Sequence, residues 1–218
     1  MEINDKYYKL ADLILDWNEK INVTAIKDKE EFINKNIIDS LTIERCKEIK
    51  DAKKVLDLGT GGGFPGLPLA LAYPDKTFVL VDSVAKKLKV VQDVAGSLNL
   101  SNVETLHGRA EDLAKKKELR ESFDLVVSRA VANMSTLSEY CLPFVKLGGF
   151  FIAYKTAASK EEIDGAKKAI EILGGTIEEL VSDGIEGSEH LFVVIKKIKT
   201  CPSLYPRKAG IPTEKPLS

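Results

Sequence analysis

Cysteine is scarce in this sequence: Cys46, Cys141 and Cys201 are the only three in 218 residues. They lie far apart, so no pair has the spacing of metal ligands, and an odd number does not suggest a disulfide framework. This cysteine usage is typical of a reducing compartment. We therefore predict a cytoplasmic protein without a metal site.

Long apolar runs and an excess of one charge are also missing. No run approaches the roughly 20 apolar residues that span a bilayer, and the N-terminus lacks the cationic and apolar regions of a signal peptide. We therefore expect no membrane partner. The 32 Lys and Arg residues nearly balance the 33 Asp and Glu residues, which leaves a formal net charge of −1. Nucleic acid would thus have to bind at a local basic patch rather than through the overall field.

The length of the chain fits one α/β domain with a small extension, which we expect to be a monomer. Apolar residues recur every three or four positions from Ile3 to Ile21, and this spacing predicts a helix. A second helical pattern runs from about residue 28 to residue 50. We therefore assign residues 1–50 to a helical extension. Four prolines interrupt residues 201–218, which we predict to be a tail without a regular element.

Residues 51–200 alternate short β-branched runs with amphipathic helical stretches. Continuous apolar strands separated by helices indicate a parallel sheet that is covered on both faces. The last two runs are joined by too few residues for a parallel crossover. We therefore predict an α/β, Rossmann-like fold with a mostly parallel sheet and an antiparallel last strand. The predicted strands are 55–58, 77–83, 102–107, 123–128, 148–155, 176–182 and 189–198.

A glycine-dense turn follows the first predicted strand and leads into a helix. It contains Gly59, Gly61, Gly63 and Gly66, and Asp57 precedes it. Glycine permits positive φ angles and a close approach of a ligand to the backbone. In an open α/β sheet, such a turn lies at the carboxyl ends of the strands, where ligands bind. We therefore predict a cofactor site at this turn.

Three further polar positions follow the next strands in order. The second strand ends at Asp82, at the distance of about 20 residues at which a carboxylate meets ribose hydroxyls. The segment Gly108–Asp112 follows the third strand, where a polar loop fits an adenine edge, and the fourth strand ends at Arg129. This order favours a nucleoside cofactor over a purely structural glycine turn.

Two classes of cofactor share this layout. Gly61-x-Gly63-x-x-Gly66 satisfies the dinucleotide fingerprint, which leaves NAD as an alternative. The spacing Asp57-x-Gly59-x-Gly61-x-Gly63 is instead the form found in S-adenosylmethionine-dependent methyltransferases, where the acid suits the cationic methionine amine. The chain leaves no room for a second catalytic domain, and no tyrosine is followed by a lysine four residues later. These points and the antiparallel end of the sheet favour S-adenosylmethionine.

The methyl acceptor leaves fewer marks in the sequence. There is no Pro-Pro-aromatic motif of amino-group methylases, and Cys141 and Cys201 fall in a helix and in the tail rather than at a strand end. His107 and His190 are better interpreted as core or surface residues, so no obvious general base is present. This absence fits an acceptor that is nucleophilic as it stands, such as guanine N7, with catalysis by positioning and desolvation.

The chain resembles the RsmG (GidB) family of bacterial 16S rRNA guanine-N7 methyltransferases. The resemblance covers nearly the whole chain. The glycine turn is only class-specific, whereas the Phe-Pro-Gly ending, the Ser-Arg-Ala segment and the Tyr-Pro-Arg tail are together highly specific. The matching pieces are Trp17-Asn18, Asn22-Val23-Thr24, Asp39-Ser40-Leu41, Asp57 to Gly66, Val81-Asp82-Ser83 with Lys86-Lys87, Gly108-Arg109-Ala110-Glu111, Ser128-Arg129-Ala130-Val131-Ala132, Tyr205 to Pro212 and Pro216-Leu217.

The resemblance implies methyl transfer from S-adenosylmethionine to N7 of a guanine in 16S rRNA, either free or in a small-subunit particle. We assign Arg129 as the catalytic residue, because it is expected above the cofactor, where it would hold the guanine, a phosphate or the methionine carboxylate. Lys155, Arg207 and Lys208 are the predicted RNA contacts, because phosphates need cations. The predicted cofactor-binding residues are Asp57, Gly59, Gly61, Gly63, Phe64, Asp82, Ser83, Ala110, Glu111 and Arg129.

Two positions depart from the family pattern. Asn36 stands where the family often has His, and Thr156 stands where it often has Gly after Lys155. Two other hypotheses stay open beside the rRNA enzyme. One is a methyltransferase for a small molecule or a protein, which would need no basic rim. The other is a cofactor-sensing or ribosome-assembly protein that binds S-adenosylmethionine without turnover.

Overall fold

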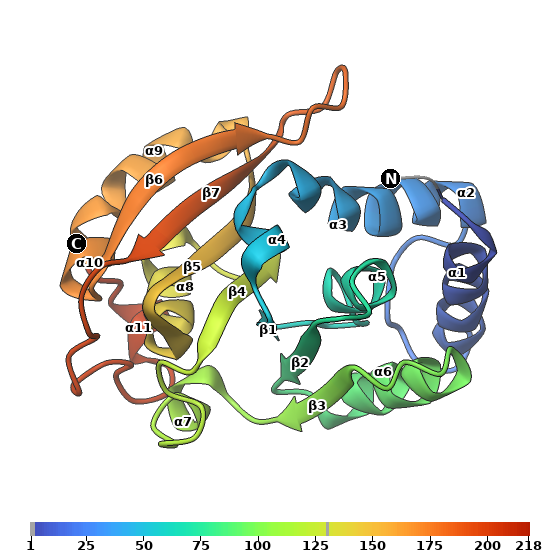
Figure 1. The fold of residues 1–218 in the computed structure, drawn as a ribbon, viewed down its shortest axis with the longest axis horizontal. Helices are drawn as coiled ribbons and strands as arrows, with labels where there is room; N and C mark the ends of the chain where they lie inside the picture. The colour runs from blue at the N-terminus through green and yellow to red at the C-terminus, as the bar shows by residue number, and fades with distance from the viewer. Residues whose placement is uncertain (1–2, 130) are drawn as a thin grey trace.

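The computed structural model describes residues 3–129 and 131–218, so Ala130 of the Ser-Arg-Ala segment lies outside the described residues. A seven-stranded sheet runs through the molecule in the order β3-β2-β1-β4-β5-β7-β6 (Figure 1). Strand β7 runs antiparallel to both of its neighbours, β5 and β6, whereas the pairs from β3 to β5 are parallel, which confirms the predicted fold. The strands are β1 (Lys54–Leu58), β2 (Thr77–Asp82), β3 (Val103–His107), β4 (Phe123–Arg129), β5 (Val145–Thr156), β6 (Gly175–Ser182) and β7 (His190–Lys197).

Helices cover both faces of this sheet. The α-helices are α1 (Asp5–Asn18), α2 (Lys29–Phe32), α3 (Asp39–Leu41), α4 (Glu48–Asp51), α5 (Gly66–Ala72), α6 (Ala85–Ser97), α7 (Ala110–Leu113), α8 (Met134–Cys141), α9 (Lys160–Gly165), α10 (Lys167–Ile172) and α11 (Ile211–Glu214). The π-helical turn is η1 (Ile33–Ile38), and the 3-10 turns are η2 (Thr42–Arg45), η3 (Leu142–Phe144) and η4 (Ala157–Ser159). No helix among the described residues is long and apolar enough to cross a membrane.

The core divides into two apolar clusters, one on each face of the sheet. Side chains of a strand alternate between faces, so Val55 of β1 packs into one cluster while Leu56 and Leu58 pack into the other. The first face carries α1, the helical turns from α2 to α4, α5 and α6 (Figure 1). The second face carries α7 to α10, and the buried Cys201 at the start of the tail joins it.

The N-terminal helices belong to the first cluster and share its core with the sheet. Leu10 and Ile14 of α1 are fully buried in the same cluster as Val55 and Leu80. The described part of residues 1–50 therefore has no hydrophobic core of its own. The division into residues 1–50, 51–200 and 201–218 remains a prediction from the sequence.

Three predicted elements differ from the structure. The helix expected over residues 28–50 is broken into α2, η1, α3, η2 and α4, and within it the carbonyl of Lys35 accepts a hydrogen bond from Arg129. One of the amphipathic helical stretches expected between the strands, α7, is only a short helix that ends at Leu113. The tail contains the short helix α11, because Pro212 lies in its first turn, where the missing N–H is harmless.

The strand order places a crevice at the centre of the sheet. From β1 the chain moves outward to β2 and β3, and it then returns to β4 on the other side of β1. Parallel sheets bind ligands outside the carboxyl ends of the strands at such a switch point. The glycine turn after β1 and Arg129 at the end of β4 lie at this place.

Candidate functional site

The glycine turn after β1 is held on both sides by hydrogen bonds. The backbone N–H groups of Gly59 and Thr60 donate to the carbonyl of Val81, at 2.8 and 2.9 Å. Asp57 Oδ2 accepts from the Thr60 hydroxyl at 2.6 Å and from the Gly66 N–H at 2.9 Å. The turn is therefore fixed before any ligand binds.

Asp57 ties the glycine turn together from inside. Its side chain is fully buried, and its Oδ1 has no hydrogen-bond partner among the described residues. Burial raises the pKa of Asp57 to about 6, although the hydrogen bonds from Thr60 and Gly66 oppose this shift. The contacts that the structure shows for this acid thus act on the loop itself.

Three glycines of the turn face different surroundings. Gly61 has φ +58°, and a Cβ built on it would meet nothing within 4 Å. This position faces open space, which leaves the backbone accessible to a ligand. A Cβ on Gly62 would instead lie 2.4 Å from Cγ1 of Val23, so the N-terminal segment packs directly on the turn. Gly63 is tight for a different reason, because its Cβ would lie 2.4 Å from Leu67 Cδ1.

Asp82 connects the glycine turn to the end of β2. Its Oδ2 accepts from the N–H of Gly61 at 2.8 Å, and its Oδ1 accepts from the N–H of Val84 at 2.8 Å. The side chain is mostly buried but lines a cavity. A carboxylate offers about four acceptor sites, so lone pairs remain for hydroxyl donors of a ligand.

Three neighbouring cavities lie at the carboxyl ends of the strands. Cavity A, of about 360 Å³, is lined by Gly59, Asp82, Ser83, Ala110 and Glu111 among others. Cavity B, of about 230 Å³, is lined by Gly59, Gly61, Phe64, Asn36 and Arg129 among others. Cavity C, of about 530 Å³, is lined by Asn36, Asp39, Arg129, Tyr154 and His190 among others.

Shared lining residues place these cavities next to one another. Cavities A and B share Gly59 and Lys87, and cavities B and C share Asn36 and Arg129. The three cavities therefore follow one another from the end of β2, past the glycine turn, to the ends of β4 and β5. A ligand in cavities A and B would meet a second ligand in cavity C beside Asn36 and Arg129.

Arg129 is held at this junction by the N-terminal segment. Its Nη1 donates to Asp39 Oδ2 at 2.8 Å and to the carbonyl of Lys35 at 3.1 Å, and its Nη2 donates to Asn36 Oδ1 at 2.8 Å. Its guanidinium also lies 5.8 Å from the ring centroid of Phe64. The predicted catalytic residue is thus fixed by contacts from η1 and α3, and 19% of its side chain is exposed.

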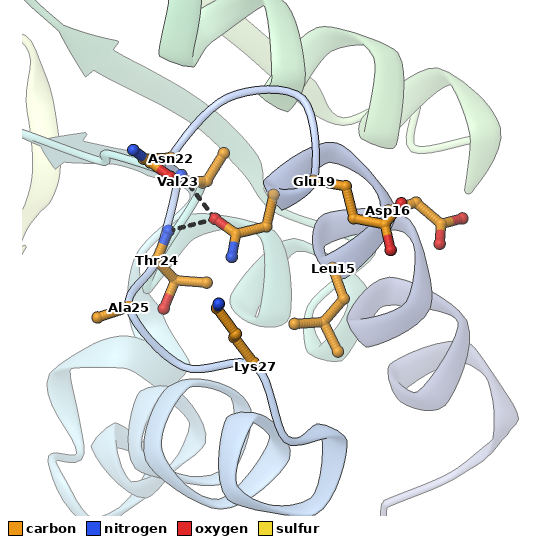
Figure 2. Close-up of a pocket in the computed structure, with 9 residues that line it drawn as sticks. Leu15, Asp16, Glu19, Asn22, Val23, Thr24, Ala25 and Lys27 are labelled. Atoms are coloured by element: carbon orange, nitrogen blue, oxygen red, sulfur yellow. Dashed lines mark hydrogen bonds between the residues drawn. The ribbon is translucent and has the colours of Figure 1, made fainter.

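A loop of the N-terminal segment covers the other side of the glycine turn. Asn18 Oδ1 accepts from the N–H groups of Val23 and Thr24, at 2.8 and 2.9 Å, which are drawn as dashed lines in Figure 2. Val23 and Thr24 line cavity B and also a larger polar hollow of about 790 Å³ beneath the loop. That hollow is further from the strand ends than cavities A to C, and Asp16, Glu19 and Lys27 are among the residues that line it (Figure 2).

The structure gathers most of the predicted cofactor residues around cavities A and B. Gly59, Gly61, Phe64, Asp82, Ser83, Ala110, Glu111 and Arg129 line them, whereas Asp57 and Gly63 support the turn from behind. Sequence reasoning missed Asn36, Asp39 and His190 as site residues. His190 Nδ1 lies 2.7 Å from Asp39 Oδ1, so the residue interpreted as core or surface joins the Arg129 network. Asp39 belongs to the Asp-Ser-Leu segment that matches the family, but its contact with His190 spans 151 residues of sequence and leaves no local signal.

The residues around cavities A and B fit S-adenosylmethionine. Gly61 leaves an open cradle beside the backbone, and Asp82 presents acceptors that suit ribose hydroxyls. Glu111 would lie toward the adenine edge, since it lines cavity A beyond Asp82. Among the described residues there is no cluster of His, Cys, Asp or Glu that could hold a metal ion.

The three predicted RNA contacts have different surroundings. Arg207 bonds the buried carboxylate of Glu139, with Nη2 to Oε2 at 2.6 Å and Nε to Oε1 at 2.9 Å. Lys155 Nζ lies 2.7 Å from Glu162 and donates to the carbonyl of Ala132. Lys208 is exposed. The structure therefore uses Arg207 to anchor the tail, and Lys208 is the member of the set with an exposed side chain.

Sequence comparisons place the chain beside bacterial enzymes of ribosomal RNA. Residues 3–192 match the family model GidB, described as rRNA small subunit methyltransferase G. A protein of Clostridium novyi named ribosomal RNA small subunit methyltransferase G is 51% identical, and the match covers 100% of this chain and 92% of that protein. A protein of Clostridium tetani with the same name is 49% identical, with 97% and 89% covered.

Solved structures agree on the fold. The O-methyltransferase TomG of Streptomyces achromogenes, solved in complex with S-adenosylmethionine, is similar with a TM-score of 0.58. Its sequence identity is 16%, and the match covers 91% of this chain and 92% of that chain. At this identity the likeness supports the methyltransferase fold alone.

Proposed function

This chain belongs to the rRNA small subunit methyltransferase G family, and we propose that it transfers a methyl group from S-adenosylmethionine to N7 of a guanine in the RNA of the small ribosomal subunit. The observation that carries this proposal is the set of three neighbouring cavities at the strand ends. Cavities A and B suit the cofactor, and cavity C meets them at Arg129. Family membership and this geometry support the same reaction class.

Each residue group has a separate task in the proposed reaction. When bound, S-adenosylmethionine supplies an electrophilic methyl group, which the lone pair of guanine N7 takes while the sulfur keeps the electrons of the broken bond. Asp82 and the open side of Gly61 hold the cofactor. Arg129 lies at the junction with the acceptor, where the contacts from Asp39 and Asn36 keep it in one orientation. Positioning of two reactants in this way lowers the barrier without a proton transfer.

The absence of an assigned general base agrees with this acceptor. Guanine N7 carries no proton, so none has to leave when the methyl group is added. His190 is bonded to Asp39 and is 52% exposed, and we assign it no proton-transfer role. The chemistry that remains is alignment and the exclusion of water, which the cavity walls of Phe64, Tyr154 and Phe192 support.

Cavity C suits a single nucleobase. Its volume of about 530 Å³ lies within the roughly 300–1,000 Å³ of small-ligand sites. Enzymes that modify a base take it out of the stack into such a pocket. We propose that the exposed Lys208 and the rim of cavity C contact RNA phosphates, and that the protein acts as a monomer in the cytoplasm on rRNA or on the small-subunit particle.

The experiment that tests this function measures tritium transfer from labelled S-adenosylmethionine. The acceptors are small-subunit particles that lack the modification, the naked rRNA, bulk protein and a pool of small metabolites. We expect label in the rRNA, recovered as 7-methylguanosine, and no transfer by an Asp82→Ala variant. Label in protein or metabolites would contradict the proposal and would favour a methyltransferase for a small molecule or a protein. Tight cofactor binding with no label in any fraction would favour a protein that binds without turnover.

A further inference from the structure

We propose that Asn36 is the residue that selects guanine, because its side-chain amide donates a hydrogen bond to O6 of the base in cavity C. This inference rests on the proposed function. It starts from a polar atom that the network around Arg129 leaves unused.

The amide of Asn36 has a partner on one side only. Its Oδ1 accepts from Arg129 Nη2 at 2.8 Å. Its Nδ2 is buried and has no hydrogen-bond partner among the described residues. A buried donor without an acceptor costs free energy, so such a group in a native structure calls for a partner that the described residues do not supply.

Arg129 fixes which end of the amide is free. A guanidinium group has only donors, so it must face the oxygen of Asn36 and not the nitrogen. The Arg129 guanidinium is itself held by Asp39 and by the carbonyl of Lys35. The free end of the Asn36 amide is therefore its donor, Nδ2.

Asn36 lies where the two reactants would meet. It lines both cavity B, beside the glycine turn, and cavity C. Asn36 belongs to the π-helical turn η1, a geometry that occurs often at functional sites. Because Asn36 already lines cavity C, a small shift of this turn that keeps the bond to Arg129 is enough to open the covered Nδ2 to a base in that cavity.

The chemistry of the acceptor identifies the partner of this donor. On its major-groove edge, guanine presents two acceptors, N7 and O6. N7 has to face the methyl group, so O6 is the atom of that edge left to be recognised. Adenine has an amino donor at the same place. A hydrogen-bond donor beside the methyl group therefore favours guanine over adenine.

Substitutions at this position can separate the two ends of the amide. A histidine ring N–H is also a donor, so histidine can replace the donor of Asn36. Aspartate has the shape of asparagine and still accepts from Arg129, but it presents an oxygen to O6. Asn36→Asp thus removes the donor while it keeps the contact that orients Arg129.

The test combines this variant with a change in the base. The wild-type reaction first identifies the methylated guanine, and that nucleotide is then replaced by 2-aminopurine, which has N7 but lacks O6. The reactivity of the analogue itself cancels when the guanine to 2-aminopurine ratio of kcat/KM is compared between enzymes. Asn34→Asp is the matched control, because it makes the same change at an exposed position of the same turn.

We expect Asn36→Asp to lower kcat/KM for the guanine substrate by roughly ten- to a hundredfold, the range for a buried donor replaced by an acceptor. The guanine to 2-aminopurine ratio should fall at least about tenfold, by the same interaction. S-adenosylmethionine affinity, measured by calorimetry, should stay within about twofold. Asn36→His should retain most of the activity, and Asn34→Asp should behave as wild type.

Two results would overturn the inference. One is an unchanged guanine to 2-aminopurine ratio of kcat/KM in Asn36→Asp, which would mean that loss of the Asn36 amide and loss of O6 act independently. The other is a large loss of S-adenosylmethionine affinity in Asn36→Asp, which would assign the free amide to the cofactor. Failure of the proposed function would be seen earlier and separately, as wild-type protein that produces no 7-methylguanosine in rRNA.

Discussion

Replacement of Arg207 by alanine should destabilise the whole fold rather than remove an RNA contact. Glu139 lies in α8 with no exposed surface, and its carboxylate accepts from the backbone N–H, Nε and Nη2 of Arg207. These bonds raise the pKa of Arg207 above its usual value. The alanine variant would keep only the backbone N–H, so a buried negative charge would lose its cation.

The magnitude follows from the burial of the carboxylate. Removing one partner of a buried ion pair costs about 3–5 kcal/mol, because the remaining charge is left uncompensated. In a chain of this size each kcal/mol lowers Tm by about 2–4 °C, so Tm should fall by roughly 10 °C. Urea denaturation and calorimetry measure both quantities. Lys208→Ala is the control, because Lys208 is the exposed neighbour.

The double variant Arg207→Met with Glu139→Gln separates the charge from the packing. It removes the buried charge together with its partner, so it should recover much of the lost stability. The salt dependence of RNA binding provides the second readout, and it should change in Lys208→Ala but not in folded Arg207→Ala. A wild-type Tm for Arg207→Ala, combined with a weaker salt dependence, would refute this reasoning and restore the RNA contact.

Three further predictions concern the cofactor loop. Asp82→Ala should weaken S-adenosylmethionine binding at least about tenfold, or about 1.4 kcal/mol, since Asp82 also holds Gly61 and Val84; wild-type affinity in calorimetry would contradict the role. Gly62→Ala should destabilise the fold by about 1–3 kcal/mol through its clash with Val23, and Val23→Ala should relieve part of this loss; purely additive effects would argue against the contact. Because burial raises the pKa of Asp57 to about 6, the folded state binds that proton more tightly than the unfolded chain. The free energy of unfolding should therefore fall by about 3 kcal/mol as the pH rises from about 4 to about 6, and Asp57→Asn should lack this decrease in urea titrations, whereas an identical slope in both proteins would exclude it.

The sheet was predictable because its signals are local. Each parallel strand is a short apolar run between helices, and the short connection before β7 excludes a parallel crossover. The glycine turn and Asp82 were predictable for the same reason, since both directly follow strands whose carboxyl ends must meet. The segment over residues 28–50 was not, because its turns are shaped by long-range contacts such as the bond from Arg129 to Lys35.

The tail shows the same limit more clearly. Its prolines exclude a long helix, but they give no sign that Arg120 would bind it to the domain. Arg120 Nη2 donates to the carbonyls of Cys201 and Pro202, and its Nη1 donates to that of Tyr205. A basic motif such as Tyr-Pro-Arg-Lys is equally compatible with RNA binding and with an internal anchor. For Arg207, the bonds to the buried Glu139 favour the internal anchor, and the sequence gives no sign of them.

The site therefore depends on both ends of the chain. Segments before β1 supply Asn36 and Asp39, which hold Arg129, and the tail reaches Glu111 through the N–H of Gly210 at 3.4 Å. Tyr140, which lines cavity A, also lies 3.0 Å from the hydroxyl of Thr213 in α11. Elements outside the central sheet thus line or support cavities A, B and C. Because these elements share the core of the domain or bury charge against it, a substitution far from the cavities can alter methyl transfer through the geometry of the walls.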